Sequence, residues 1–239
     1  MTPYGPYNIV IHANPQYRRA DFPFEPATGD AAERYEQRIR VTLNAISDFE
    51  SGRALLSSLV SWVPVYIVPY RGGDCNAVTG QLTSDLMKGI RIQYSPETWA
   101  HDACGHWPGY RPMETLFHEL VHASRFTSLG FVGLDKTPLK DMQDAEEFLA
   151  VMMTNVFRSE QGAKKLNRDY RTGALVSQLQ LEFLLSSRNE YLKSLTSMRG
   201  DPLVSSVARL FMPFNPFRDL NRLKKIQSVP QVPSRTRLA

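Results

Sequence analysis

The segment PMETLFHELVHAS, residues 112–124, decides how the rest of the chain is interpreted. Its apolar residues recur at the intervals of an amphipathic helix: Met113, Leu116, Phe117, Leu120 and Val121. Pro112 suits the first turn of a helix, because a backbone N–H at that position has no intrahelical partner. The segment therefore predicts a helix that begins near residue 112 and buries one face in a core.

His118, Glu119 and His122 form the pattern HExxH within this helix. At about 100° per residue, His122 lies about 40° around the helix from His118, and both lie away from the apolar stripe. Two imidazoles stacked in this way can bind one metal ion, while Glu119 reaches the open side of that ion. With five histidines in 239 residues, chance would produce the pattern in about one such chain in two hundred. The pattern therefore predicts a metal site with Glu119 as the general base.

A catalytic zinc site normally has a third protein ligand, and no histidine follows His122 in the chain. The third ligand is therefore expected to be a carboxylate on the helix predicted over about residues 143–158. We choose Glu147, because small residues follow it one turn later and leave space for a metal, and we keep Glu146 as the substitute. Asp144 and Glu147 also have the spacing of a capping box, so a purely structural role for Glu147 stays open.

These ligands predict one zinc ion per chain and peptide hydrolysis. Zinc lowers the pKa of a bound water, Glu119 accepts its proton, and the same carboxylate then protonates the leaving amine. The oxyanion of the reaction needs a further donor, which the sequence leaves open. Tyr170 and Arg168 are the first candidates. Tyr110 and Arg111 are the second, and all four could equally be ordinary surface residues.

His101, Cys104 and His106 form the pattern HxxCxH just before the predicted helix. A structural zinc site has four protein ligands, and no further cysteine or histidine lies near enough in the sequence to complete one. We therefore expect these three residues to bind no metal. With Cys75 as the only other cysteine, a disulfide framework is excluded and a reducing compartment is expected.

The segments around this helix predict further helices and a few short strands. Capping-box spacings open two early helices, from Asp30 through Ile46 and from Ser47 through Leu59. The other expected elements are strands at Ile9–Ile11, Val63–Val68 and Gly89–Tyr94, a loop over Arg71–Ser84, and helices over Val176–Thr196 and Pro202–Phe211. The strand Gly89–Tyr94 alternates apolar and polar residues, so it could bind an extended substrate at a sheet edge, although an interior position stays open.

Composition favours one domain of residues 30–216, with an irregular leader at 1–29 that could carry a secretion signal, and a basic tail at 217–239. No run of about 20 apolar residues is present, so no membrane span is expected. The first twenty residues lack the pattern of a general secretory signal peptide. The tail has six Lys or Arg and one acidic residue, which gives it a net charge of +5. Because the whole chain has a net charge of +4, the excess of positive charge lies in the tail. Without stacking aromatics or a known motif, no nucleic-acid partner is expected.

The chain resembles the NleD-like family of bacterial effector metalloproteases over about residues 45–168. The resemblance rests on SGRALLSSL (51–59), GIRIQYSP (89–96), PMETLFHELVHAS (112–124) and EEFLAVMMTNVFRSEQG (146–162). It implies that His118 and His122 bind zinc, that Glu119 is the base, and that a glutamate of the EEF segment is the third ligand. It further implies delivery by a type III secretion system into the host cytoplasm and cleavage of host proteins. In the best-known members those are mitogen-activated protein kinases, cut in the activation loop.

From the residues and the resemblance together we expect an α+β fold, a mostly helical minimal zincin with a small sheet beside the active-site helix. The expected function is that of a monomeric, translocated zinc endopeptidase that cleaves a host signalling protein. The alternative is a non-catalytic effector that binds host proteins and whose metal site is structural.

Overall fold

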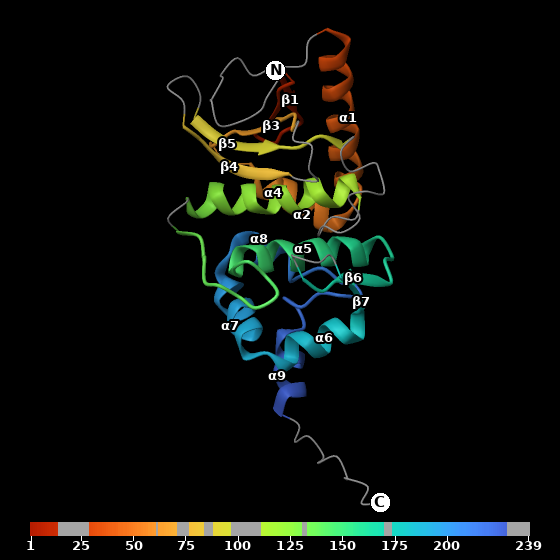
Figure 1. Ribbon diagram of the computed structural model, residues 1–239, viewed down its shortest axis with the longest axis vertical. Coiled ribbons are helices and arrows are strands. Elements are labelled where there is room, and N and C mark those ends of the chain that lie inside the picture. The colour runs from red at the N-terminus through yellow and green to blue at the C-terminus, as the bar shows by residue number, and fades with distance from the viewer. Residues whose placement is uncertain are drawn as a thin grey trace, which may run out of the picture.

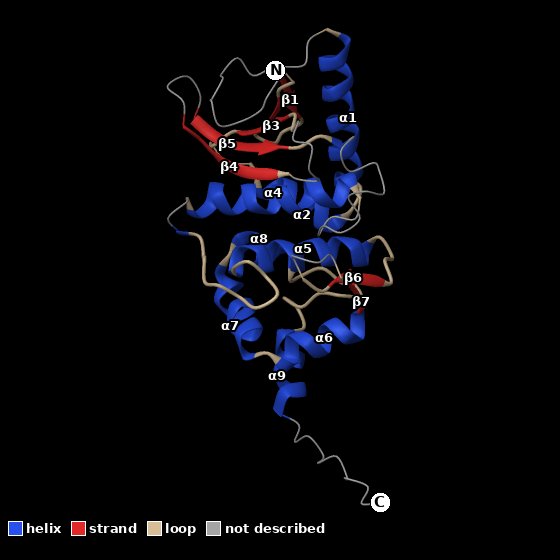
Figure 2. Cartoon of the chain, viewed as in Figure 1, coloured by secondary structure: helices blue, strands red, loops and turns tan. Residues whose placement is uncertain are grey.

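The computed structural model describes residues 1–13, 29–60, 62–70, 77–83, 88–96, 111–130, 133–169 and 174–228. These residues form an α+β arrangement in which helices predominate and a small mixed sheet lies at one end of the molecule (Figures 1 and 2). The sheet strands are β1 (Thr2–Tyr4), β2 (Ile9–Ile11), β3 (Val65–Val68), β4 (Val78–Thr83) and β5 (Lys88–Gln93). Their order is β1-β2-β3-β5-β4, with β2, β3 and β5 parallel and the two outer strands antiparallel to their neighbours. The first eleven residues of the expected leader thus contribute two strands.

Strand β4 corrects one expectation about this sheet and decides between two positions for a neighbouring strand. It lies within the segment 71–84, which was expected to be a loop, and it forms one edge of the sheet beside β5. The expected strand near Gly89–Tyr94 is present as β5 and lies between β3 and β4, so the interior position is observed of the two that were left open. Its polar Arg91 and Gln93 are buried along with its isoleucines, because neighbours cover both of its faces. The period-two pattern therefore did not mark an exposed face.

Helix α1 (Asp30–Ser47) packs beside the sheet at β2, whereas α2 (Glu50–Ser58) packs against the helices α1, α4 (Pro112–Leu129), α5 (Ala145–Glu160) and α8 (Pro202–Val207). The four positions expected to be buried in the first helix are all buried in α1, namely Tyr35, Ile39, Leu43 and Ile46. The predicted capping boxes are wrong, since neither helix has a side-chain cap from within its own first turn. The N-terminus of α2 is instead capped by Glu160, whose carboxylate accepts hydrogen bonds from the backbone N–H groups of Glu50 at 2.6 Å and Ser51 at 3.0 Å. This cap comes from a residue more than 100 positions away.

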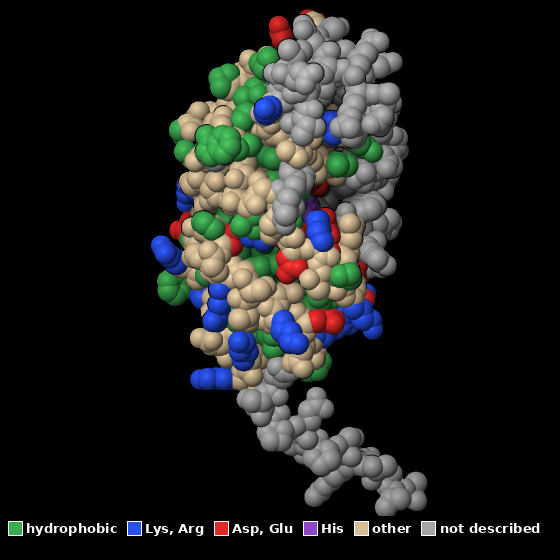
Figure 3. Space-filling model, turned by 90° about the vertical axis from the view of Figure 1, so that its left-hand side faces the viewer, with side chains coloured by type: hydrophobic (Ala, Val, Ile, Leu, Met, Phe, Trp, Pro, Cys, Tyr) green, Lys and Arg blue, Asp and Glu red, His purple; other side chains and the backbone are tan. Residues whose placement is uncertain are grey.

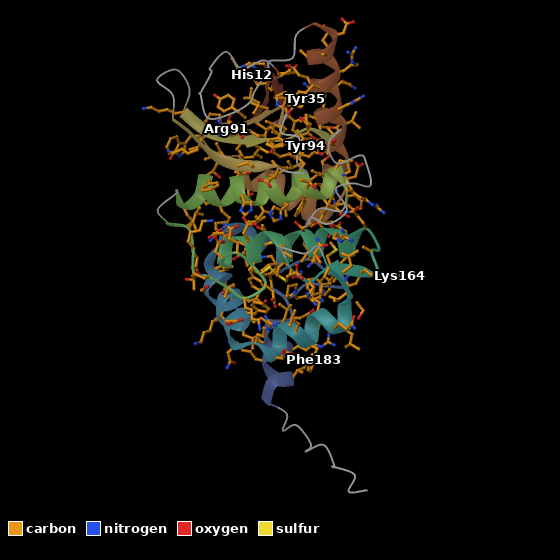
Figure 4. All side chains as sticks on the ribbon, viewed as in Figure 1. His12, Tyr35, Arg91, Tyr94, Lys164 and Phe183 are labelled. Atoms are coloured by element: carbon orange, nitrogen blue, oxygen red, sulfur yellow. The ribbon has the colours of Figure 1, made fainter. Side chains whose placement is uncertain are left out.

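The predicted central helix is present as α4 (Pro112–Leu129) and begins at the expected proline. The hydroxyl of Tyr94, just after β5, donates to the carbonyl of Pro112 at 2.7 Å. The hydroxyl of Tyr35 on α1 in turn donates to the carbonyl of Tyr94 at 3.0 Å, and Figure 4 labels both tyrosines. These two bonds fix the start of α4 relative to the sheet and to α1.

The rest of the chain lies on the other side of α4, away from the sheet (Figure 1). It consists of α5 (Ala145–Glu160), β6 (Lys165–Asn167), β7 (Leu175–Ser177), α6 (Gln178–Ser187), α7 (Asn189–Ser197), the 3-10 turn η3 (Met198–Gly200), α8 (Pro202–Val207) and α9 (Leu220–Ser228). The single helix expected over Val176–Thr196 is wrong, because Arg188 is extended and separates α6 from α7 while its guanidinium donates to Asp141 at 2.7 Å. Helix α9 lies in the segment assigned to the basic tail, and its Leu220 and Leu223 are buried in the core.

One hydrophobic core runs through both parts of the molecule and includes side chains from the sheet, from α4 and α5, and from the C-terminal helices. Among the described residues, no helix combines the length and the apolar character that crossing a membrane requires.

Candidate metal centre

Two antiparallel helices bring the candidate metal ligands together. His118 and His122 lie one turn apart on α4, and Glu147 lies in the first turn of α5. The imidazole of His118 is 5% exposed, that of His122 is 11% exposed, and the carboxylate side chain of Glu147 is 13% exposed. Figure 3, in which histidine is purple, shows only a small area of histidine surface on the face in view. The group is thus nearly enclosed.

The three side chains are spaced as the ligands of one ion would be. The Nε2 atoms of His118 and His122 are 3.1 Å apart. Nε2 of His118 is 3.2 Å from Oε2 of Glu147, and Nε2 of His122 is 3.3 Å from Oε1. Nitrogen and oxygen donors placed tetrahedrally around zinc at their usual bond lengths are about 3.4 Å apart. These three residues could therefore hold a metal ion.

The charges of the group depend on each other. Burial lowers the pKa of His122, but the charge of Glu147 and its hydrogen bond outweigh this effect, and the pKa rises to about 9. Burial likewise raises the pKa of Glu147, and the two imidazoles overcome it and hold the pKa well below its usual range. In the metal-free chain at neutral pH, Glu147 is therefore ionised and His122 is protonated. A metal ion would replace that proton as the positive charge between them.

Glu146 points to a different part of the structure. Its carboxylate accepts two hydrogen bonds from Arg125, at 3.0 Å from Nε and at 2.8 Å from Nη2. It also accepts a third, at 2.9 Å, from the backbone N–H of Asp135. Arg125 completes the cluster by pairing with Asp201, and the side chains of the ion pairs are at most 6% exposed. Glu146 is thus absent from the group near the histidines.

The capping role that was left open for this region falls to Asp144. Its Oδ1 accepts a hydrogen bond from the backbone N–H of Glu147 at 3.0 Å, while Oδ2 pairs with Lys136 at 3.0 Å. The side chain of Glu147 points to the histidines and takes no part in this cap. The cap fixes the first turn of α5, and it leaves the Glu147 carboxylate available to a metal.

Glu119 lies next to the first histidine but is held by the sheet. Its Oε2 is 2.6 Å from Oγ1 of Thr79 on β4, and its backbone carbonyl is 3.1 Å from the same hydroxyl. Glu119 is 7% exposed, and its charge contributes to the raised pKa of His122. The candidate base is therefore close enough to the metal group to interact with it electrostatically.

Of the four candidates for the oxyanion donor, the structure describes two, Arg168 and Arg111, and both have partners outside the metal group. Arg168 is in an ion pair with Asp169 at 2.9 Å. Arg111 is the exposed residue that precedes α4, and its backbone N–H is bonded to Glu114 of that helix. Tyr170 and Tyr110 lie outside the described residues. The pattern His101, Cys104 and His106 also lies outside them.

Two functional features were missed from the sequence. Thr79 lies in the segment that was expected to be a loop, although the β-branched Val78, Thr79 and Thr83 favour a strand there. Arg125 lies three residues after His122 and is buried. A buried arginine is normally paired with a carboxylate, so its position in the helix was a signal for an ion pair. No sequence spacing identifies that partner as Glu146 or Asp201.

Comparison with known proteins adds no relative: no family model, no curated protein and no solved structure matches this chain.

Proposed function

We propose that this protein is a zinc-dependent endopeptidase with a zincin-like fold, whose metal ligands are His118, His122 and Glu147. The observation that carries the proposal is the spacing of the three donor groups, 3.1, 3.2 and 3.3 Å between facing atoms. Two imidazoles and one carboxylate are a usual ligand set of catalytic zinc in hydrolases, in which a fourth position is left to water.

The residues around the group match the needs of peptide hydrolysis. A bound zinc ion would supply Lewis-acid chemistry, lowering the pKa of a water molecule and polarising a peptide carbonyl. Glu119 accepts a proton from the attacking water and returns it to the leaving amine. Among the described residues, Oε1 of Glu119 has no hydrogen-bond partner, so this oxygen is available to accept that proton.

The edge of the sheet is suited to bind the substrate. Strand β4 pairs with β5 along one side, and its other side has no strand partner within the described residues. An unpaired strand edge can bind an extended peptide through backbone hydrogen bonds. Because Thr79 of β4 contacts Glu119, a peptide bound along this edge would lie beside the base. The proposed substrate strand is thus β4 and not β5.

The class of substrate rests on the resemblance to the NleD-like effectors. On that basis we propose a host signalling protein as the substrate, with a mitogen-activated protein kinase cut in its activation loop as the first candidate. The proposal includes delivery by a type III secretion system into the host cytoplasm and action as a monomer.

The test is to incubate the purified zinc-loaded chain with host-cell lysate and to identify new protein N-termini by mass spectrometry. The wild-type chain and a control variant at an exposed glutamate of α1, Glu33→Ala, should produce the same new N-termini. The chelated chain and Glu119→Ala, which should keep its zinc, should produce none. Cleavage by Glu119→Ala would contradict the assigned base. A zinc-bound wild type that cleaves nothing would favour the non-catalytic effector with a structural metal site.

A further inference from the structure

Within the described part of the chain, the hydroxyl of Thr79 is the only hydrogen-bond partner of the Glu119 side chain. The 2.6 Å separation from Oγ1 to Oε2 of Glu119 is short for a hydrogen bond, as expected when a hydroxyl donates to an ionised carboxylate. The hydroxyl has one proton, and its separation from the backbone carbonyl of Glu119 is longer, 3.1 Å. The carboxylate is therefore the preferred acceptor.

This contact leaves the two oxygens of the carboxylate in different situations. Oε2 is bound to the sheet, whereas Oε1 has no hydrogen-bond partner among the described residues. A glutamate side chain has three rotatable bonds, so a fixed partner on one oxygen restricts where the other can point. A general base works only when the accepting oxygen is within hydrogen-bond reach of the proton.

Thr79 is itself well fixed. It lies opposite Ile92 in the antiparallel pair of β4 and β5, and Ile92 is fully buried. A β-branched side chain in a strand has restricted χ1 rotation, so few orientations are open to its hydroxyl. The support for Glu119 thus comes from the sheet and not from a neighbour on its own helix.

We propose that Thr79 is a positioning residue that holds Glu119 in the orientation needed to accept a proton. This inference rests on the proposed peptidase function, and it adds a role for the edge strand beyond pairing with the substrate. Because Thr79 acts through Glu119, its hydroxyl matters for the rate of the bound substrate and not for substrate binding or metal affinity.

The test compares Thr79→Val, which keeps the shape but removes the hydroxyl, with Thr79→Ser, which restores it. Thr127→Val is the control, because it removes a threonine hydroxyl that forms a hydrogen bond but does not contact Glu119. The Thr127 hydroxyl donates to the backbone carbonyl of Ser124 on α4 at 2.9 Å. Zinc affinity and thermal unfolding establish that each variant is folded and loaded. Thr79→Val should lower kcat about 10- to 100-fold with KM changed less than about threefold, while Thr79→Ser and Thr127→Val should stay near wild type.

Crystal structures of the zinc-loaded variants supply a readout that does not depend on activity. In the wild type and in Thr79→Ser, the Glu119 carboxylate should be within hydrogen-bond distance of the hydroxyl at position 79. In Thr79→Val it should turn away or occupy several conformers. An unchanged Glu119 orientation in Thr79→Val would overturn the proposal, as would a raised KM with unchanged kcat. An inactive wild type in which Glu119 still depends on Thr79 would instead contradict the peptidase function alone.

Discussion

Glu146 and Glu147 are consecutive residues of α5, yet their carboxylates have separate partners. Glu147 faces both imidazoles of α4 at 3.2 and 3.3 Å. Glu146 forms an ion pair with Arg125 of α4 through two hydrogen bonds. Successive residues of a helix point about 100° apart, so one carboxylate serves the metal group while the other holds the two helices together.

Neutralising each of these glutamates in turn should separate metal binding from stability. Glu147→Gln should weaken zinc binding roughly 100-fold, because it replaces a charged ligand by a neutral one. Glu146→Gln should still bind one zinc ion, but its unfolding free energy should fall by about 3 kcal/mol, since a buried ion pair loses one charge. Zinc competition titrations and denaturant unfolding measure the two effects. A Glu146→Gln chain that loses zinc while Glu147→Gln keeps it would contradict the assignment of the ligand.

A second buried ion pair offers a matched comparison for Arg125. Arg158 of α5 pairs with Glu114 of α4, so each helix supplies one arginine and one carboxylate to its partner. Both Arg125→Met and Arg158→Met should lose about 3 kcal/mol or more of stability, because each removes the arginine of a buried ion pair. At a temperature where both variants are folded, only Arg125→Met should also weaken zinc binding. It leaves the charged Glu146 carboxylate, directly before Glu147, without the guanidinium that holds it, whereas Glu146→Gln removes that charge.

Equal zinc affinity in the two arginine variants would show that the Arg125 pair has no special effect on the ligand. Isothermal titration with a zinc buffer, combined with circular dichroism to confirm folding, provides the comparison.

Zinc binding should release nearly one proton per chain at pH 7.5. The pKa of His122 in the metal-free chain is about 9, so the imidazole is protonated at that pH and must lose the proton to bind a metal. Zinc affinity should therefore rise with pH until about pH 9. Calorimetric titrations in buffers of different protonation enthalpy measure the number of protons. Binding without proton release at pH 7.5 would contradict the raised pKa.

The raised pKa of His122 also makes the stability of the metal-free chain depend on pH. Because the pKa of His122 lies above its unfolded value of 6.5, its stabilising contribution is complete below about pH 6.5 and is lost as the pH rises through about 9. The melting temperature of the metal-free chain should fall over this interval. Thermal unfolding in a chelating buffer between pH 6 and pH 10 checks the direction, and a melting temperature that rises would contradict it.

The features that the sequence predicts well are those that depend on one element at a time. A helical period of 3.6 residues is enough to place Tyr35, Ile39, Leu43 and Ile46 in the core and to bring the rings of His118 and His122 into contact one turn apart. The sequence also favoured Glu147 over Glu146 as the third ligand, because small residues one turn after Glu147 leave space for a metal on that side of the helix.

The features that were missed depend on contacts between distant segments. Thr79 and Glu119 are 40 residues apart, and Arg125 and Asp201 are 76 residues apart. An edge strand such as β4 is specified by its pairing with β5 as much as by its own residues. The cap of α2 comes from Glu160 for the same reason, so the local capping boxes were misleading.

X-ray absorption at the zinc edge of the reconstituted chain tests the central claim most directly, namely that two imidazoles and one carboxylate hold the ion and leave a position to water. The spectrum should show four nitrogen or oxygen neighbours at about 2.0–2.2 Å, with the scattering of two imidazoles, and it should be unchanged in a variant with His101, Cys104 and His106 replaced by alanine. A sulfur neighbour at about 2.3 Å, or a third imidazole, would show a site closed by the chain itself and would contradict the account.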